Sequence, residues 1–590
     1  MNVLKLGRAV AALGALAVAA SCHSLDVVNP NAPSSKVLTD PGILKAVAGG
    51  TMRTWFNAYQ NLEIAGVLDV QAMTLASSWN NGNINSYQHL AVGPADTITS
   101  PATWTRPNSW YNDLASPQRT SLERWWYNMY SVISSSNDAL NAIRNQKVSL
   151  GDDATTRSAE AVAQLMQGAA YMVISNDYDQ GYYLDENTPK DSLVTLVRVS
   201  RGVLRDSAVA MLQRAATVAG GTSFTTDKAW ANGIAYSNTQ IAQIANTLAA
   251  FALAYYARDA QEASTVVDWA KVASFASQGI SSGTPVTFRF VGDGSAWYND
   301  MDGWFTDIST GRISTRIGHF LDPATQLDPY ALGVGSEQPN SADMRLGDGS
   351  FGAADIVDGW CTIPKDAGGG SYFAYSSCGE IQRPDRGFYA QSNIGIIRND
   401  DSGDMSYDVQ PGEIGLARVI IPSINDLLWA EALLRVGNAA DLPKAAQLIN
   451  NTRVTVGGLP EATAADPVGS PDDGDCMSNG KLAKDGGACT LWSKLLYEED
   501  IEQLQMGPVS FWHQRELPLV IATAWERATG CRSAPCAPNA NSIYNGPRYV
   551  QGLIPGTARE MPVPAKELAV KAEPFYTFGG TDPAKGPEAP

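Results

Sequence analysis

Aromatic and amide side chains gather in two stretches that lack helical spacing, 77–90 and 295–307. Aromatic rings can stack on flat C–H faces, and amides can hydrogen-bond the rim of hydroxyl groups that a sugar presents. We therefore predict a ligand site built from these two stretches. The side chains that we expect to serve as its platforms and edge groups are Trp79, Asn81, Trp297, Tyr298 and Trp304.

A guanidinium group follows the second stretch closely. Arg316 is the expected hydrogen-bond donor to the same ligand, because a guanidinium offers several N–H groups in a fixed plane. The alternative is structural: the aromatic residues would pack a loop-rich part of the chain against its helices. Composition cannot separate these two interpretations.

Catalytic and metal-binding patterns are weak in this sequence. It contains neither HExxH nor GxSxG, and its four His residues are scattered. The carboxylate run 498–500 lies on a predicted helix, where such a run usually forms a solvated face. A glycosidase instead needs two carboxylates about 5–9.5 Å apart across a cleft. We expect no catalytic residue, no metal and no cofactor.

The seven cysteines divide into one near the N-terminus and six that form sequence-local pairs in Gly-, Pro- or Asp-rich stretches. Loops held by disulfides suit an exported protein, although six thiols allow fifteen connectivities. The candidate pairs are Cys361 with Cys378, Cys476 with Cys489, and Cys531 with Cys536.

Residues 1–21 have the parts of a secretory signal. Lys5 and Arg8 precede the apolar run Ala9–Ala20, whose roughly 18 Å of helix is too short for a hydrocarbon core of about 30 Å. Cys22 directly after Ala-Ala-Ser resembles the bacterial lipobox, with Ala19 where a larger aliphatic residue is usual. The resemblance implies cleavage before Cys22 and lipidation of that residue, which would anchor the chain to a membrane.

Length and composition bound the remaining possibilities. The chain has 590 residues, 44% of them hydrophobic and 17% charged, so most of it should be globular. Its formal net charge of −18 becomes two units more negative without the leader, which argues against nucleic acid as a partner. No later stretch is long and apolar enough to span a membrane.

Helical periodicity dominates two regions, about 40–280 and 415–530, where several predicted helices follow one another in pairs. Between about 281 and 415 the chain is rich in Gly, Asp, Pro and aromatic residues, with short β-type runs at 286–291 and 394–398. We therefore predict a mainly α fold: a helical scaffold plus a loop-rich lobe carrying short strands. The predicted helices are 121–145, 157–176, 202–217, 238–257, 266–280, 424–436 and 441–455.

Five motifs occur in an order that resembles the SusD/RagB family of outer-membrane nutrient-binding lipoproteins. They are LDVVNPN at 25–31, W-x3-Y-x2-I-x3-N at 126–137, AEA…N-x2-R at 430–453, E-x3-E-x4-G at 498–507, and MPVP with Glu567 at 561–567. Two residues depart from the fourth motif, because Glu499 and Gln503 stand where the family has Arg and Leu. The resemblance covers residues 22 to about 570. We interpret Asn137, Glu431 and Arg453 in these motifs as structural residues that fix helix contacts, with contact to a ligand as the alternative.

The resemblance implies one SusD-like domain over 22–590, with tetratricopeptide-like helix pairs. It also implies a lipid-anchored protein on the outer face of the outer membrane. Such a protein would capture a glycan or oligosaccharide and act as the lid of a SusC-like, TonB-dependent transporter. In the family the ligand face is built largely from non-helical insertions, which favours the aromatic stretches described above.

Two alternatives to glycan capture stay open at this point. A surface-anchored glycosidase or peptidase would place catalytic carboxylates in a cleft. The same lid architecture could instead hold a peptide or another oligomer. Product analysis after incubation with polysaccharides separates the first alternative from pure binding, and binding assays separate the second.

Overall fold

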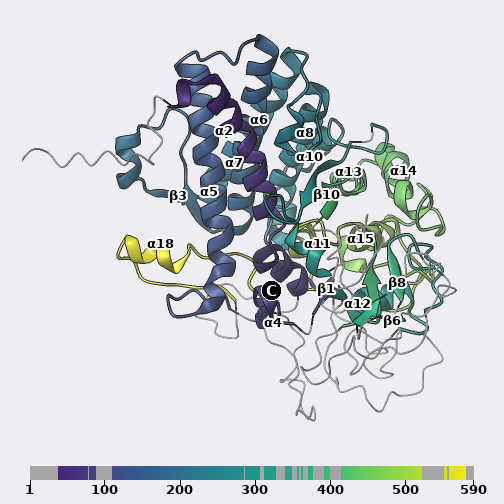
Figure 1. Cartoon of the computed structure of the whole chain (residues 1–590). Coiled ribbons are helices and arrows are strands. Elements are labelled where there is room, and N and C mark those ends of the chain that lie inside the picture. Colours follow the sequence, from purple (N-terminus) through teal and green to yellow (C-terminus); the bar gives the residue numbers. More distant parts are fainter. Residues whose placement is uncertain are drawn as a thin grey trace, which may run out of the picture.

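The N-terminal half forms a block of helices that pack side by side in chain order (Figure 1). Each member contacts the next along the chain, from α2 through α10. The helices are α2 (Pro41–Tyr59), α5 (Thr120–Leu140), α6 (Asp153–Asp177), α7 (Arg201–Gly221), α8 (Asn238–Ala254) and α10 (Trp269–Ala276). This computed structural model describes residues 37–77, 79–87, 109–284, 286–305, 311–326, 339–347, 355–357, 360–362, 370–375, 391–398, 414–520, 550–553 and 557–579.

Helix α6 illustrates why these sequences pack as they do. The Asp152 carboxylate accepts a hydrogen bond from the Thr155 N–H at 2.6 Å and so caps the helix. From Ser158 onward every residue is buried, which matches a segment rich in small and apolar residues. At Gly168 a Cβ atom would lie only 2.7 Å from Leu212 of α7, so the missing side chain sets the close approach of the two helices.

A second helical group follows in the C-terminal half and joins the first through contacts between α10 and α13. Pro422 occupies the first turn of α13, two residues before the predicted start, and Gly437 ends that helix with a φ of 73°, directly after the predicted last residue. Helices α14 and α15 both pack on α13. The group comprises α13 (Pro422–Val436), α14 (Leu442–Arg453), α15 (Leu491–Glu502) and α16 (Val509–Arg515).

Short helices connect and flank these two groups. The α-helices among them are α3 (Val67–Gln71), α4 (Ile84–Tyr87), α9 (Ala260–Thr265), α11 (Asp300–Phe305), α12 (Thr315–Leu321) and α18 (Ala565–Val570). Two π-helical segments are η2 (Leu62–Gly66) and η6 (Asn141–Asn145). The 3-10 turns are η1 (Val37–Thr39), η3 (Asn81–Asn83), η5 (Pro117–Arg119), η7 (Lys190–Thr195), η8 (Lys228–Trp230), η11 (Ala439–Asp441) and η12 (Pro471–Asp473).

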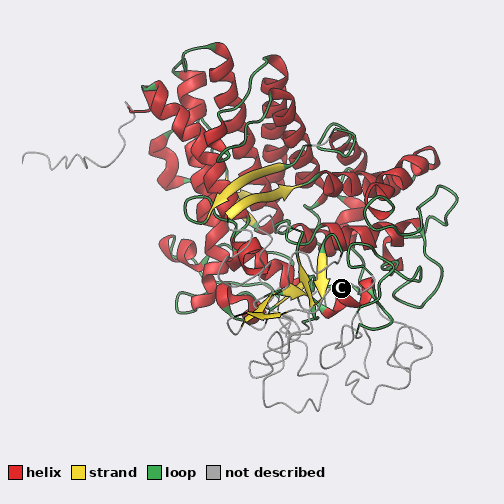
Figure 2. Ribbon diagram, turned by 45° about the vertical axis from the view of Figure 1, so that its right-hand side comes forward, coloured by secondary structure: helices red, strands yellow, loops and turns green. Residues whose placement is uncertain are grey.

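The strands of the described residues form antiparallel pairs (Figure 2). In the longest pair, Phe288 lies opposite Ile420 and Asp293 opposite Ile414, so one ladder joins the start and the end of the predicted loop-rich lobe. The pairs are β4 (Phe288–Asp293) with β10 (Ile414–Ile420), β1 (Leu75–Ala76) with β5 (Arg312–Ile313), β2 (Gln180–Tyr182) with β3 (Arg198–Ser200), β6 (Asp355–Val357) with β7 (Trp360–Thr362), and β8 (Phe373–Tyr375) with β9 (Ile394–Ile396).

One segment near the C-terminus, 557–579, returns to the first helical block, and we call it the C-terminal strap. The Trp110 indole N–H donates to the Glu560 carbonyl at 2.9 Å, and the Trp110 backbone N–H donates to the Phe578 carbonyl at 3.2 Å. The Met561 N–H donates to the Asp177 carbonyl at 2.7 Å, at the end of α6. The strap therefore forms hydrogen bonds with Trp110 and with the end of α6, which precede it by hundreds of residues.

The mainly α class and all seven predicted helices are confirmed. The one predicted at 266–280 is shorter, because α10 begins at Trp269 with its N-cap at Asp268 and ends at Ala276. The Gly- and Asp-rich composition of 463–490 indicates an exposed loop, and the stretch is irregular, but Cys476 and Met477 within it are buried. Among the described residues no helix combines the length and the apolar character that crossing a membrane requires.

Candidate functional site

Trp79 and Trp304 are brought together although 225 positions of sequence numbering separate them. Their ring centroids lie 6.5 Å apart, and the two ring planes are inclined by 53°. Both side chains are half-buried, so each ring has one part against protein and another part accessible. Two tilted, partly exposed indoles form an angled aromatic platform.

Helix α11 positions Trp304. The Asp300 carboxylate accepts from the Leu62 N–H at 2.9 Å, and the Met301 N–H donates to the Gln60 carbonyl at 3.1 Å. Both contacts fix the start of α11 on the end of α2 and on η2, where Met301 and Phe305 are buried. With those two residues facing the core, the intervening Trp304 is turned to the partly exposed side.

A tight turn positions Trp79. The Trp79 N–H donates to the Ser77 hydroxyl at 3.1 Å, and the chain then enters η3. Gly82 has a φ of 62°, and a Cβ atom there would lie 3.0 Å from Leu62, so a glycine suits this turn. Asn81, two residues after Trp79 at the start of η3, is exposed.

Trp297 and Tyr298 take different positions from Trp304. The Trp297 side chain is only 7% exposed and packs on Phe56 and Phe290, with ring centroids 6.0 and 5.6 Å away. Trp297 thus follows the structural alternative, in which an aromatic residue joins the lobe to the helices. Tyr298 is half-buried, and its backbone N–H donates to the Asn57 side chain at 3.2 Å.

The structure does not place Arg316 where it could donate a hydrogen bond to a ligand, contrary to the prediction from the sequence. The residue is fully buried, its guanidinium pairs with the Asp500 carboxylate, and its Nε donates to the Val550 carbonyl at 2.8 Å. A donor to a surface ligand has to be accessible, so we remove Arg316 from the candidate site. The physical cause is Asp500, a buried carboxylate that needs a cationic partner.

The prediction that the carboxylate run 498–500 forms a solvated face is wrong, because the run is buried. Glu498 and Glu499 are fully buried and Asp500 is 2% exposed. Burial raises the pKa of the Glu498 carboxyl, while the neighbouring Arg345 guanidinium opposes that shift. A buried run cannot flank a polymer at the surface.

The motif residues that were expected to fix helix contacts do so. Asn137 of α5 accepts a hydrogen bond from Gln167 of α6. Glu431 pairs with Arg435 at 2.7 Å within α13. Arg453 donates to the Pro460 carbonyl at 2.7 Å and also pairs with Glu498.

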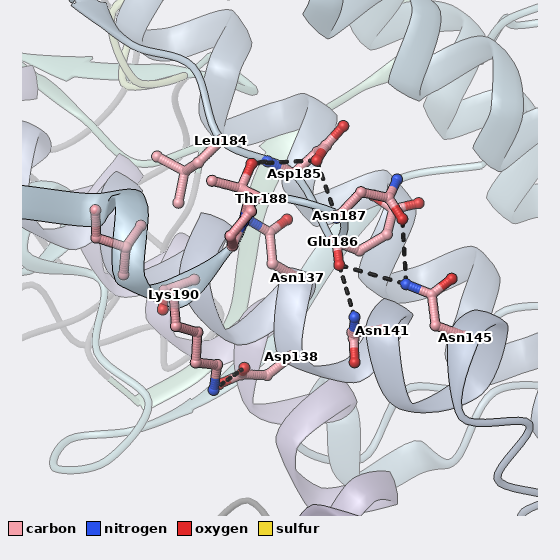
Figure 3. Close-up of a pocket in the computed structure, with 13 residues that line it drawn as sticks. Asn137, Asp138, Asn141, Asn145, Leu184, Asp185, Glu186, Asn187, Thr188 and Lys190 are labelled. Atoms are coloured by element: carbon pink, nitrogen blue, oxygen red, sulfur yellow. Dashed lines mark hydrogen bonds and ion pairs between the residues drawn. The ribbon is translucent and has the colours of Figure 1, made fainter. Parts of the chain in front are cut away.

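A polar pocket of about 400 Å³ lies between the end of α5, with η6, and the segment 184–193 (Figure 3). The Asn141 amide donates to the Glu186 carbonyl at 2.7 Å, and Asn145 donates to the Asn187 side chain at 3.1 Å. Lys190 pairs with Asp138 at 3.2 Å across the same pocket. These contacts tie the loop to the helix, so most of the polar groups already have protein partners.

This polar pocket was missed by sequence reasoning. A usable signal was present, because Asn137, Asn141 and Asn145 recur every four residues and therefore share one helix face. The sequence gives no equally simple signal for the segment 184–193 that closes the pocket.

The cysteine predictions are resolved for one pair. Cys476 and Cys489 form a disulfide, as predicted from their proximity. The side chain of Cys361 and the whole of Cys378 lie outside the described residues, as do Cys531 and Cys536. The leader 1–21 and the lipidation candidate Cys22 lie outside them as well.

Comparison with solved structures identifies the fold. The structure of a SusD superfamily protein from Bacteroides thetaiotaomicron matches 93% of this chain and 99% of its own, with a TM-score of 0.51 and 12% sequence identity. At such low identity this likeness shows the fold alone, which confirms the resemblance at the level of architecture. No known protein family and no curated protein matches the chain by sequence.

Two further structures match with lower scores. A SusD-like carbohydrate binding protein from Bacteroides vulgatus covers 82% of this chain and 85% of its own, at a TM-score of 0.48 and 11% identity. A chitin-binding SusD homolog from Flavobacterium johnsoniae covers 84% and 89%, at a TM-score of 0.43 and 12% identity.

Proposed function

We propose that this chain, which has the SusD-like fold, is a cell-surface binding protein that captures a glycan or oligosaccharide. In this proposal Cys22 carries the lipid anchor in the outer membrane, and the protein acts as the lid of a SusC-like, TonB-dependent transporter. The observation that carries the binding role is the platform formed by Trp79 and Trp304. The anchor and the transporter partner rest on the lipobox and the five ordered motifs.

The angle between the two indoles supports an extended, bent ligand. Each ring can stack on the C–H face of one sugar unit, and a 53° inclination between the rings suits consecutive units whose planes are rotated. Asn81, exposed two residues after Trp79, would hydrogen-bond a hydroxyl group at the edge of the platform. Tyr298, half-buried in the same lobe, is retained as a further edge group.

Binding is better supported than catalysis. The carboxylate run on α15, the strongest sequence candidate for acid–base chemistry, is buried between arginines. The fold likeness is to a SusD superfamily protein, and no catalytic motif contradicts a purely binding role. A surface glycosidase or peptidase stays the alternative, and analysis of products after incubation with polysaccharides is its direct test.

Binding is tested by affinity electrophoresis and calorimetry against a panel of soluble polysaccharides. Trp79→Ala and Trp304→Ala are each expected to weaken binding by about fivefold or more, because stacking on an aromatic face is worth roughly 1 kcal/mol or more. Trp429→Ala is the matched control, since Trp429 is also half-buried but lies on α13. Unchanged binding in both platform variants would refute the proposed site.

The ligand class is decided by the same panel. If the protein binds members of a soluble peptide library but none of the polysaccharides, and the platform variants lose that binding, the site is assigned to peptides. If the protein releases oligosaccharide products, and mutation of a single carboxylate abolishes that release, the protein is an enzyme and the binding role is replaced by catalysis.

The anchor and the partner need separate experiments. Mass spectrometry of the mature N-terminus is expected to find acylated Cys22, and Cys22→Ala is expected to move the protein out of the membrane fraction. Co-purification from detergent-solubilised outer membranes is expected to yield a TonB-dependent barrel. An unacylated, freely soluble mature protein would contradict both expectations.

A further inference from the structure

A second cluster of ionisable side chains lies deep in the scaffold, where helices α13, α15 and α16 meet. Glu431 comes from α13, Glu499 from α15, and His513 from α16, while Glu516 follows directly after α16. Each of these four residues is at most 1% exposed. Nothing in the proposed glycan site uses them.

The geometry of the cluster matches a set of metal ligands. One ligand atom each from Glu431, His513 and Glu516 can be chosen so that all three lie within 4.8 Å of one another. Zinc bonds of about 2.0–2.2 Å would require these atoms to close in by about 1 Å, which side-chain rotation can supply. His513 and Glu516 are three residues apart and share one side of the chain as it leaves α16.

Hydrogen bonding leaves the cluster incomplete. Among the described residues, neither oxygen of Glu516 has a hydrogen-bond donor, and the second oxygen of Glu431 and Nδ1 of His513 also lack partners. His513 Nε2 lies 2.9 Å from Glu499 Oε2, which is ion-pair distance, but within the described part of the chain neither ring nitrogen and neither Glu499 oxygen has a partner with hydrogen-bond geometry. Buried polar atoms rarely stay unsatisfied, because each costs roughly 1–3 kcal/mol.

Charge points in the same direction. Among the described residues, Glu431, Glu499 and Glu516 bring three carboxyl groups to the cluster, and one guanidinium, that of Arg435, pairs with it through Glu431 at 2.7 Å. Three ionised carboxylates against one guanidinium would leave two negative charges in excess in a site closed to solvent, and one divalent cation would neutralise them. The adjoining charges are already paired, since Asp500 binds Arg316 and Glu498 binds Arg345.

We propose that Glu431, His513 and Glu516 bind one divalent transition-metal cation, with Zn²⁺ as the preferred occupant. Glu499 then acts as a positioning residue that fixes the His513 ring through the 2.9 Å contact. One imidazole nitrogen among carboxylates favours Zn²⁺ over the all-oxygen sets that Ca²⁺ and Mg²⁺ prefer. The cation would tie α13 to α16 directly, and α15 through the contact of Glu499 with His513, and so serve structure.

The test uses the purified full-length mature chain, stripped with a chelator and dialysed against Zn²⁺. Elemental analysis is expected to find one zinc per chain, and the thermal unfolding midpoint is expected to rise with zinc concentration. His513→Gln and Glu516→Gln are expected to weaken zinc binding by about tenfold or more. His319→Gln is the matched control, because His319 is also buried, on α12, with Nδ1 3.1 Å from the Gln326 carbonyl.

A measurement on the unmutated chain covers the case in which the variants fail to fold. X-ray absorption at the zinc edge is expected to show one imidazole among oxygen ligands and no sulfur ligand. The proposal is overturned if zinc neither binds nor changes the unfolding midpoint, which would mean that protons alone neutralise the cluster. It is equally overturned if both variants bind zinc as the unmutated chain does, or if the spectrum lacks imidazole.

Discussion

Arg345 Nη1 lies 2.7 Å from Glu498 Oε2, and both side chains are fully buried although 153 residues separate them in sequence. Arg345 comes from the loop-rich lobe and Glu498 from helix α15 of the scaffold. The pair belongs to a buried network whose charges balance. Its cations are Arg345, Arg398 and Arg453, and its carboxylates are Asp343, Glu498 and Glu502. This network binds the lobe to the helices and differs from the Glu431 cluster, where carboxylates outnumber cations.

Removing the central cation of this network should be severely destabilising. Arg345→Met leaves Glu498 and Asp343 buried without their main partner, and the expected loss in the free energy of unfolding is about 3–5 kcal/mol. Chemical denaturation followed by circular dichroism measures it.

The control for this variant is Arg124→Met. Arg124 pairs with Glu63 at the surface, where its side chain is 48% exposed, so the expected loss is about 1 kcal/mol or less. Equal losses in the two variants would show that burial does not govern the contribution of these ion pairs.

Two adjacent glycines of α2 should respond to alanine in opposite directions. At Gly49 a Cβ atom would lie 1.9 Å from Cδ1 of Trp230, so Gly49→Ala is expected to cost about 1–3 kcal/mol of unfolding free energy. At Gly50 nothing lies within 4 Å of the new atom, so Gly50→Ala is expected to stabilise the helix by about 0.5–1 kcal/mol. Thermal unfolding of the two variants side by side checks the sign of each effect, and a shift of the same sign in both would contradict the packing at Trp230.

The disulfide between Cys476 and Cys489 should stabilise the irregular stretch before α15. It closes a loop with a sequence separation of 13, for which chain entropy gives about 3 kcal/mol. We expect the unfolding midpoint of the parent protein to fall when the disulfide is reduced. The double variant Cys476→Ala, Cys489→Ala is expected to show the same lower midpoint without reductant. Peptide mapping without reductant checks the connectivity, and a double variant as stable as the parent would refute the contribution.

Asp177 should give the protein a pH-dependent stability. It ends α6, and its carboxylate accepts the Trp512 indole N–H at 2.9 Å. Burial raises the pKa of Asp177 to about 6, although the guanidinium of Arg515 lowers it in part. The charged and titratable groups that face it are Arg515, Arg258, Tyr59 and Tyr178.

The sign follows from comparing the folded and unfolded chains. The pKa of an unfolded Asp is about 3.9, so between pH 4 and 6 the folded state binds more protons than the unfolded state. The contribution of Asp177 is therefore most favourable at about pH 4, falls by about 3 kcal/mol up to about pH 6, and is constant above. Asp177→Asn should remove this slope while keeping an acceptor for Trp512, and urea titrations at several pH values compare the two proteins. Identical pH profiles would contradict the raised pKa.

Helices were predictable from the sequence because their signals are local. The apolar spacing in α5, Pro422 at the start of α13 and Gly437 at its end each act within a few residues. The pairing of β4 with β10 was not predictable in the same way. It joins Phe288 to Ile420, and no local pattern specifies a partner so distant along the chain.

The candidate site was predictable in composition but not in detail. Trp297 and Trp304 belong to the same short stretch, yet one is packed on Phe56 and the other meets Trp79, because Trp297 precedes α11 whereas Trp304 lies on that helix. Likewise Arg316 and the run 498–500 have the residue types of a surface site. Arg316 and Asp500 are buried together as an ion pair. The sequence does not show that two residues so far apart along the chain will pair.

The C-terminal strap sets an order on biosynthesis. Trp110, which precedes α5, and Asp177, at the end of α6, form hydrogen bonds with residues 560–578. The ribosome adds those residues long after both. A nascent chain interrupted before residue 557 would leave those groups open to proteases, so its defect would appear far from the break. Fusion of a reporter beyond residue 579 would leave the same contacts intact, which makes that position the better choice for tagging.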